Sequence, residues 1–256
     1  MTPGGAVTPG GAVSGAAARP RVRISTSIQS ADPARLAEEM AAVADSDRIH
    51  ADVMDNHFVP RIVGGLGQVR GLCRSTPLPV DCHLLIDDPD RWATAYAEAG
   101  AAGVTVHAEA VRAPVTTLRA IRAAGAEAGL ALMPATPVAG LVPLLAEIDI
   151  LLLLAVEPTA GGSEPLIDLV LPRVAAARRL ADAYHPGLRI QVDGGISAAT
   201  IERCAAAGAD TFTPGIAVFS ADRPADAVKD LRERAERGLA SGPASPHHTR
   251  NEGERS

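Results

Sequence analysis

Short apolar runs alternate along the chain with longer, alanine-rich stretches whose apolar residues recur at helical spacing. Runs rich in valine, isoleucine and leucine and bounded by turn residues predict β-strands, and the stretches between them predict α-helices. The predicted strands are 23–27, 48–53, 79–86, 102–108, 129–133, 148–156, 188–193 and 211–214. The predicted helices lie near 32–45, 62–75, 89–100, 112–126, 137–146, 166–184, 197–207 and 222–238.

Strict alternation of these strands and helices predicts an α/β fold, a single (β/α)8 TIM barrel spanning residues 21–239. A doubly wound sheet is the alternative, and it is less favoured because no GxGxxG motif follows the first strand. Residues 1–20 contain the repeated segment TPGGAV and are predicted to be a low-complexity, disordered leader. Residues 240–256 have a similar composition and are predicted to be a disordered tail.

Composition supports this fold and excludes several classes of partner. Aromatic residues are only 2% of the 256, so the core is built from aliphatic side chains, as in parallel strands covered by helices. The net charge of −6, with no cluster of lysine and arginine, does not predict a nucleic-acid-binding protein.

Three features predict a reduced, cytoplasmic protein without a membrane span. The longest apolar run, 148–156, is interrupted by Asp149 and is far shorter than the ~20 residues of a transmembrane helix. The N-terminus lacks the pattern of a signal peptide. The three cysteines have no CxxC spacing and are interpreted as reduced thiols.

Polar side chains gather where the predicted strands end, which in a barrel is the face that carries the chemistry. The candidates are Ser27, His50, Asp52, His83 and Asp193. His50 and Asp52 are two positions apart, so both point into the barrel. Two imidazoles and two carboxylates at one mouth suit a divalent cation such as Zn, Fe, Mn or Co better than Ca. The structural alternative is that the histidines are hydrogen-bonded core residues and Asp193 forms a turn.

Glycines follow the last three predicted strands. They are Gly161, Gly162, Gly194, Gly195 and Gly215. Barrel enzymes often bind phosphate with the backbone of the loops after strands seven and eight, so these glycines are candidate phosphate-binding positions. Turn geometry alone is the alternative explanation for each of them.

Several longer motifs, in order, resemble those of the ribulose-phosphate 3-epimerase family, and the resemblance covers roughly 23–237. The motifs are TSIQSAD (26–32), HADVMDNHFVP (50–60), DCHLLI (81–86), TVHAEA (105–110), MPATP (133–137), EPTAGGS (157–163), VDGGI (192–196) and PGIAVF (214–219). The resemblance implies a metal-dependent isomerase that inverts C3 of D-ribulose 5-phosphate through an enediolate. It also implies a sugar phosphate as substrate and self-association into a homo-oligomer.

The resemblance assigns roles residue by residue. The implied ligands of one divalent metal are His50, Asp52, His83 and Asp193. Asp52 and Asp193 are also the implied catalytic acid/base pair. The implied substrate-binding residues are Ser27, His83, Met54, Gly161, Gly162, Gly194, Gly195 and Gly215. Asp55 and His57 are expected to organise the loop after the second strand, and Asn56 replaces a glycine of the family there.

The departures from the family's motifs lie at one end of the expected site. They are Glu157 for asparagine, Thr159-Ala160 for Gly-Phe, Ser163 for glutamine, Ile216 for serine, and Leu85 and Leu154 for methionines. A divergent epimerase is therefore the first hypothesis. A paralogue acting on a different ketose or on a six-carbon ketose phosphate is an alternative, as is a non-catalytic sugar-phosphate-binding barrel.

Overall fold

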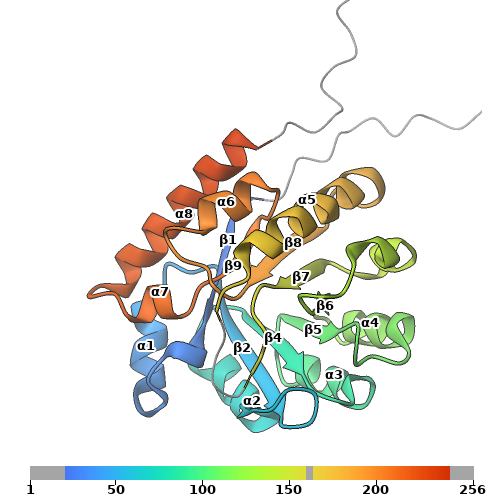
Figure 1. Ribbon diagram of the computed structural model, residues 1–256. Coiled ribbons are helices and arrows are strands. Elements are labelled where there is room, and N and C mark those ends of the chain that lie inside the picture. The colour runs from blue at the N-terminus through green and yellow to red at the C-terminus, as the bar shows by residue number, and fades with distance from the viewer. Residues whose placement is uncertain (1–20, 160–163, 243–256) are drawn as a thin grey trace, which may run out of the picture.

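The computed structural model describes residues 21–159 and 164–242. The predicted leader, Gly161, Gly162 and the tail from residue 243 onward lie outside the described residues. Within the described chain the parallel strands form a closed ring, because β1 pairs with both β9 and β2. Helices surround this ring on its outer side (Figure 1). The predicted TIM barrel is confirmed.

The bounds of the elements follow the predicted alternation closely. The parallel barrel strands are β1 (Arg23–Ser27), β2 (Arg48–Asp55), β4 (Val80–Leu85), β5 (Gly103–His107), β6 (Glu127–Leu132), β7 (Ile150–Leu154), β8 (Arg189–Asp193) and β9 (Thr211–Thr213). The α-helices are α1 (Leu36–Ala42), α2 (Leu66–Ser75), α3 (Pro89–Glu98), α4 (Pro114–Ala123), α5 (Ile167–Tyr184), α6 (Ile201–Ala206), α7 (Ile216–Phe219) and α8 (Pro224–Ser241). The 3₁₀ helices are η1 (Ile28–Ser30), η2 (Pro33–Arg35) and η3 (Val138–Glu147).

Two local differences from the predicted elements have clear physical causes. The helix predicted at 137–146 is the 3₁₀ helix η3, which contains Pro143, a residue that cannot donate the backbone hydrogen bond of an α-helix interior. The helix predicted from residue 62 begins only at residue 66. Before it, β3 (Ile62–Val63) pairs antiparallel with the end of β2. Gly64, with φ of +65°, and the glycine after it then turn the chain into α2.

Two hydrophobic clusters hold the barrel together. The larger one lies between the strands and the surrounding helices and includes the fully buried Ile24, Leu118 and Val192. The smaller one includes Leu152 and Leu154 and lines part of the barrel interior. The other side of the interior is polar, since successive inward positions of β4, β5 and β8 carry carboxylate, imidazole, hydroxyl and amide groups. No helix in the described part of the chain has the length and apolar character needed to cross a membrane.

We expect the contact of α8 with α6 to be intolerant of added volume. A Cβ atom at Gly238 would lie 2.3 Å from the backbone oxygen of Glu202. Gly238→Ala should lower the free energy of unfolding by about 1–3 kcal/mol, measured by urea denaturation. Gly71→Ala is the matched control, because Gly71 is also in a helix but a Cβ there meets nothing within 4 Å. The control should raise stability by about 0.5–1 kcal/mol. Equal effects of the two substitutions would contradict this packing argument.

Candidate metal and catalytic site

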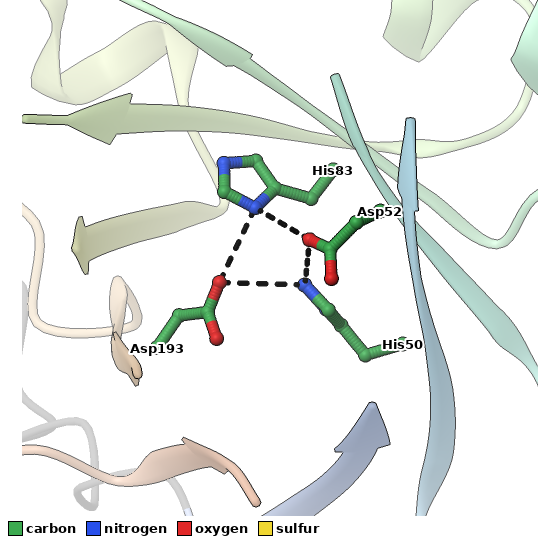
Figure 2. A group of neighbouring side chains, drawn as sticks. All are labelled: His50, Asp52, His83 and Asp193. Atoms are coloured by element: carbon green, nitrogen blue, oxygen red, sulfur yellow. Dashed lines mark hydrogen bonds and ion pairs between the residues drawn. The ribbon is translucent and has the colours of Figure 1, made fainter. Parts of the chain in front are cut away.

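Four ionisable side chains converge at the carboxyl ends of the barrel strands. His50 and Asp52 come from β2, His83 from β4, and Asp193 from the end of β8. The register places Asp52 directly beside His83, so these two side chains are neighbours across the sheet. One potential ligand atom from each of the four residues lies within 4.8 Å of the other three. Figure 2 shows the four groups pointing toward one another.

The contacts form a ring in which each histidine faces both carboxylates. The Nδ1 atom of His83 lies 3.2 Å from Asp52 Oδ1 and 3.3 Å from Asp193 Oδ2. The Nε2 atom of His50 lies 3.3 Å from Asp52 Oδ1 and 3.6 Å from Asp193 Oδ2 (Figure 2). Both imidazoles are completely buried, and the two carboxylates are exposed by only 8% and 13%.

The donor set fits a divalent cation. Within the described chain, His50 Nε2 is buried and has no hydrogen-bond partner of acceptable geometry, although it points at the two carboxylates. A cation at this point would accept its lone pair and would offset the charge of Asp52 and Asp193. Two nitrogen and two oxygen ligands suit Zn, Fe, Mn and Co. The sequence-predicted ligands are therefore brought together as a group that could hold a metal.

The pKa values of the two histidines are raised and those of the two aspartates are lowered, because the attraction between their charges outweighs burial. Burial lowers the pKa of His50, but the Asp52 charge and the close contact with the Asp193 carboxylate outweigh burial and raise that pKa well above its ordinary value. The pKa of His83 is raised for the same reasons. Burial raises the pKa of Asp52, but the neighbouring imidazoles dominate and hold it below its usual range. The pKa of Asp193 is lowered likewise. Without a metal the ring is thus a network of ion pairs.

Each of these two histidines has a further partner on its other nitrogen, and no role was predicted from the sequence for these partners. His50 Nδ1 lies 3.2 Å from Asp81 Oδ2. His83 Nε2 lies 2.9 Å from Nε2 of His107, whose Nδ1 lies 3.2 Å from Glu109 Oε2. Asp81 stands two positions before a ligand on its strand, so the DxH pattern was a usable signal. The contact of His83 with His107 joins β4 and β5, so predicting it would have required the register in which these two strands pair.

A pocket of about 280 Å³ lies over this ring. Among the predicted substrate-binding residues, those that line it are Ser27, His83, Met54, Gly194, Gly195 and Gly215. Gly161 and Gly162 fall outside the described residues. Arg61 and Glu157 also line the pocket, and they bring charges of opposite sign to it. Arg61 reaches the pocket from the loop after β2, and no sequence motif had indicated it.

Close packing restricts three glycines of the pocket wall, most strictly Gly194 and Gly195. A Cβ at Gly194 would lie 2.8 Å from the side chain of Val156, and one at Gly195 would lie 2.4 Å from Pro165. Both glycines also have positive φ values, +95° and +68°. A Cβ at Gly215 would lie 2.7 Å from Ser30 Oγ. Turn geometry therefore explains why Gly194 and Gly195 are glycines. The same geometry leaves the backbone of these residues as part of the pocket wall.

The loop after β2 is organised as the sequence predicted. The Asp55 carboxylate accepts hydrogen bonds from the backbone N–H groups of His57, Phe58 and Asp87. Asn56 has a φ of +61°, a conformation that asparagine tolerates better than most residues. Asp55 and His57 are thus loop-forming residues and are not members of the four-residue ring.

Comparisons of the sequence with known proteins indicate one family. The sequence pattern of the ribulose-phosphate 3 epimerase family matches residues 23–219. The chain is 50% identical over 218 residues to ribulose-phosphate 3-epimerase of Mycobacterium bovis, covering 85% of this chain and 94% of that protein. It is 39% identical over 204 residues to ribulose-phosphate 3-epimerase of Escherichia coli, covering 78% and 89% of the two chains. Among solved structures, 3-hexulose-6-phosphate synthase from Salmonella typhimurium shares the fold, with a TM-score of 0.62, 23% identity, and coverage of 84% and 99%.

The opposed pKa shifts predict a distinctive histidine titration in chelator-treated protein. NMR titration should show His50 and His83 with pKa values above about 6.5, because the carboxylates stabilise their charged forms. Asp52→Asn should lower both values. Since the folded pKa is the higher one, these contacts stabilise the metal-free fold fully below about pH 6.5. That stabilisation is lost as the pH rises through the folded pKa. Values below 6.5 for both imidazoles would contradict the ion-pair description.

Proposed function

The chain belongs to the ribulose-phosphate 3-epimerase family, and on that premise we propose that it inverts C3 of D-ribulose 5-phosphate to give D-xylulose 5-phosphate. The observation that carries the proposal is the pair of carboxylates, Asp52 and Asp193, at the base of the pocket. The same two imidazoles lie against both carboxylates and lower their pKa values in the free protein. A reaction that removes a proton and returns one to the opposite face requires a base and an acid, and a carboxyl pair that carries one proton supplies both.

In the proposed reaction the two carboxylates exchange roles. One of them, Asp52 or Asp193, accepts the proton from C3, which lies next to the substrate carbonyl. The electrons then occupy an enediolate, and the other carboxyl group, which carries the one proton of the pair, delivers that proton to the opposite face of C3 and is left ionised. Ser27 Oγ, 3.4 Å from Asp52 Oδ2, donates a hydrogen bond that orients this carboxylate. In the reverse direction the same two groups act in the opposite order.

We propose His50, Asp52, His83 and Asp193 as the residues that hold one divalent cation. Such a cation would supply positive charge to offset the negative charge that develops on the substrate oxygens. The histidines keep the carboxylates in place and exclude water from beneath the substrate, since both imidazoles are fully buried. Zn, Fe, Mn and Co remain the proposed candidates.

The phosphate end of the substrate is proposed to lie toward Gly194, Gly195 and Gly215. Side chains are absent at these positions, so backbone N–H groups can approach a phosphate closely. Arg61 adds a guanidinium to the same pocket, which favours an anionic substrate, whereas the Glu157 carboxylate opposes one. Gly161 and Gly162 are proposed members of this group on sequence grounds. Self-association into a homo-oligomer and a cytoplasmic location complete the proposal.

One observation favours a second candidate function. Ile216 lines the pocket with 74% of its surface exposed, at a position where the family has a serine. Leu85 and Leu154 also line the pocket, where the family has methionines. A pocket with these side chains could select another ketose or a six-carbon ketose phosphate for the same proton transfer. A non-catalytic sugar-phosphate-binding barrel retains the pocket and loses the chemistry.

Solvent exchange at C3 tests the proposed reaction. In D2O, the protein should introduce deuterium at C3 of ribulose 5-phosphate, detected by NMR or mass spectrometry. Asp52→Asn or Asp193→Asn should slow the exchange by about 10²- to 10⁴-fold, because each removes one of the two proton carriers. Asp222→Asn is the matched control, since Asp222 is an exposed aspartate on the loop before α8. Exchange with a different ketose only would support the second candidate function. Exchange with no ketose would contradict an enzyme and would support a non-catalytic sugar-phosphate-binding barrel.

Metal binding should release protons. The pKa values of His50 and His83 are raised in the metal-free protein, so a cation that takes their lone pairs displaces protons from them. At pH 7 we expect about one to two protons released per Zn²⁺ ion, measured by calorimetry in buffers of different ionisation enthalpy. Affinity should therefore increase as the pH rises.

The matched variants separate the site from other histidines. His83→Gln should abolish part of the proton release, whereas His185→Gln should leave it unchanged, because His185 Nδ1 bonds the backbone oxygen of Leu145 far from the ring. Zn²⁺ affinity that is equal in both variants would contradict the assigned ligands.

A further inference from the structure

Two imidazoles face each other beneath the pocket, and only one of them belongs to the four-residue ring. His83 turns Nδ1 toward Asp52 and Asp193, and its Nε2 lies 2.9 Å from Nε2 of His107. The two rings are close to parallel, with centroids 5.0 Å apart and planes inclined by 23°. His107 is fully buried at the end of β5. Two nitrogen atoms at this distance need one hydrogen between them, so one ring donates and the other accepts.

The direction of this hydrogen bond follows from the ring of ligands. If His83 gives the Nδ1 lone pair to a cation, its remaining hydrogen is on Nε2, and His83 is the donor to His107. His107 must then accept through Nε2, which leaves its own hydrogen on Nδ1. That Nδ1 lies 3.2 Å from Glu109 Oε2, a carboxylate oxygen that can only accept. Every hydrogen in the chain from the ligand to Glu109 has one allowed position.

The Glu109 end of this series of hydrogen bonds is fixed as well. Glu109 Oε1 accepts hydrogen bonds from the backbone N–H of Met133 and from the hydroxyl of Thr136. With two donors on Oε1, the second oxygen is directed at His107. Arg173 of α5 in turn donates to the backbone oxygens of Met133 and Thr136, which holds this loop in place. The carboxylate is therefore anchored by the loop after β6, although Glu109 itself lies in the turn after β5.

We propose that His107 and Glu109 are positioning residues that set the hydrogen of His83 on Nε2 and so keep its Nδ1 lone pair available to the metal. The inference rests on the proposed metal role of His83 and deepens the proposed function. Asp81 does the same for His50 in a single step, because its Oδ2 lies 3.2 Å from His50 Nδ1 while Nε2 faces the ring. The two ligand histidines thus each end on a carboxylate, one directly and one through a second imidazole.

Glu109→Gln tests the donor-to-acceptor direction of the hydrogen bonds that run from His83 through His107 to Glu109, with almost no change of side-chain shape. The amide has one acceptor atom, and the donors at Met133 and Thr136 require it on their side. The NH2 group then faces His107 Nδ1 and must donate to it, so the hydrogen of His107 moves to Nε2, where it opposes the donor of His83. We expect Glu109→Gln to weaken Zn²⁺ binding by about 10- to 100-fold in competition with a chromophoric chelator. Glu109→Asp, which keeps a carboxylate, should recover part of the loss.

The matched control is Glu98→Gln, which makes the same change at an exposed position on α3 and should leave Zn²⁺ affinity unchanged. Thermal unfolding of the chelator-treated variants shows whether Glu109→Gln retains the fold. Equal Zn²⁺ affinity of folded Glu109→Gln and the unmodified protein would overturn the proposal.

A second measurement needs no variant. Long-range ¹H–¹⁵N NMR of the histidine-labelled, Zn²⁺-loaded protein reports which nitrogen of each imidazole carries hydrogen. We expect hydrogen on Nδ1 of His107 and on Nε2 of His83, and in Glu109→Gln the hydrogen of His107 should move to Nε2. Hydrogen on Nε2 of His107 in the unmodified protein would overturn the proposal. This readout does not depend on turnover, so a protein inactive toward ribulose 5-phosphate could still confirm it.

Discussion

Four ionisable side chains share a small, nearly dry volume at the mouth of the barrel, and the rest of the site depends on how their charges are balanced. An unpaired charge buried in a protein costs several kcal/mol, and paired charges avoid this cost only when their geometry is good. His50 and His83 are completely buried between two carboxylates. Either protons on the imidazoles or a cation among the ligands satisfies this arrangement. The first gives a metal-free protein held by ion pairs, and the second gives the proposed active site.

The register in which the barrel strands pair brings the opposite charges together. Parallel pairing sets Asp52 beside His83, and the same pairing sets His50 beside Asp81. The inward positions of β2 and β4 thus form two pairs, His50 with Asp81 and, nearer the carboxyl ends of the strands, Asp52 with His83. Glu109 contacts His83 only through His107. The apolar part of the barrel interior contributes Leu85 and Leu154 to the wall of the pocket.

Much of the fold and of the ring could be predicted from the sequence, because both depend on periodicity along single strands. His50 and Asp52 share a face since they are two positions apart, and His83, near the end of β4, and Asp193, at the end of β8, belong to other strands of the same parallel sheet. The alternation of strands and helices is likewise a local pattern. The exceptions at η3 and β3 arise where a proline or a pair of glycines changes the backbone within a few residues.

What the sequence did not predict depends on contacts between elements. His107 meets His83 because β5 pairs with β4 in a register that sets Thr105 opposite His83, and His107 lies two positions further on. Glu109 is directed by the loop after β6, and Arg61 reaches the pocket from a loop.

Anomalous X-ray scattering from Zn²⁺-loaded crystals would test the central claim, which is a cation among the four ligand atoms. The account predicts one peak about 2.0–2.2 Å from His50 Nε2 and His83 Nδ1. A peak elsewhere, or ligation through Nε2 of His83, would contradict it.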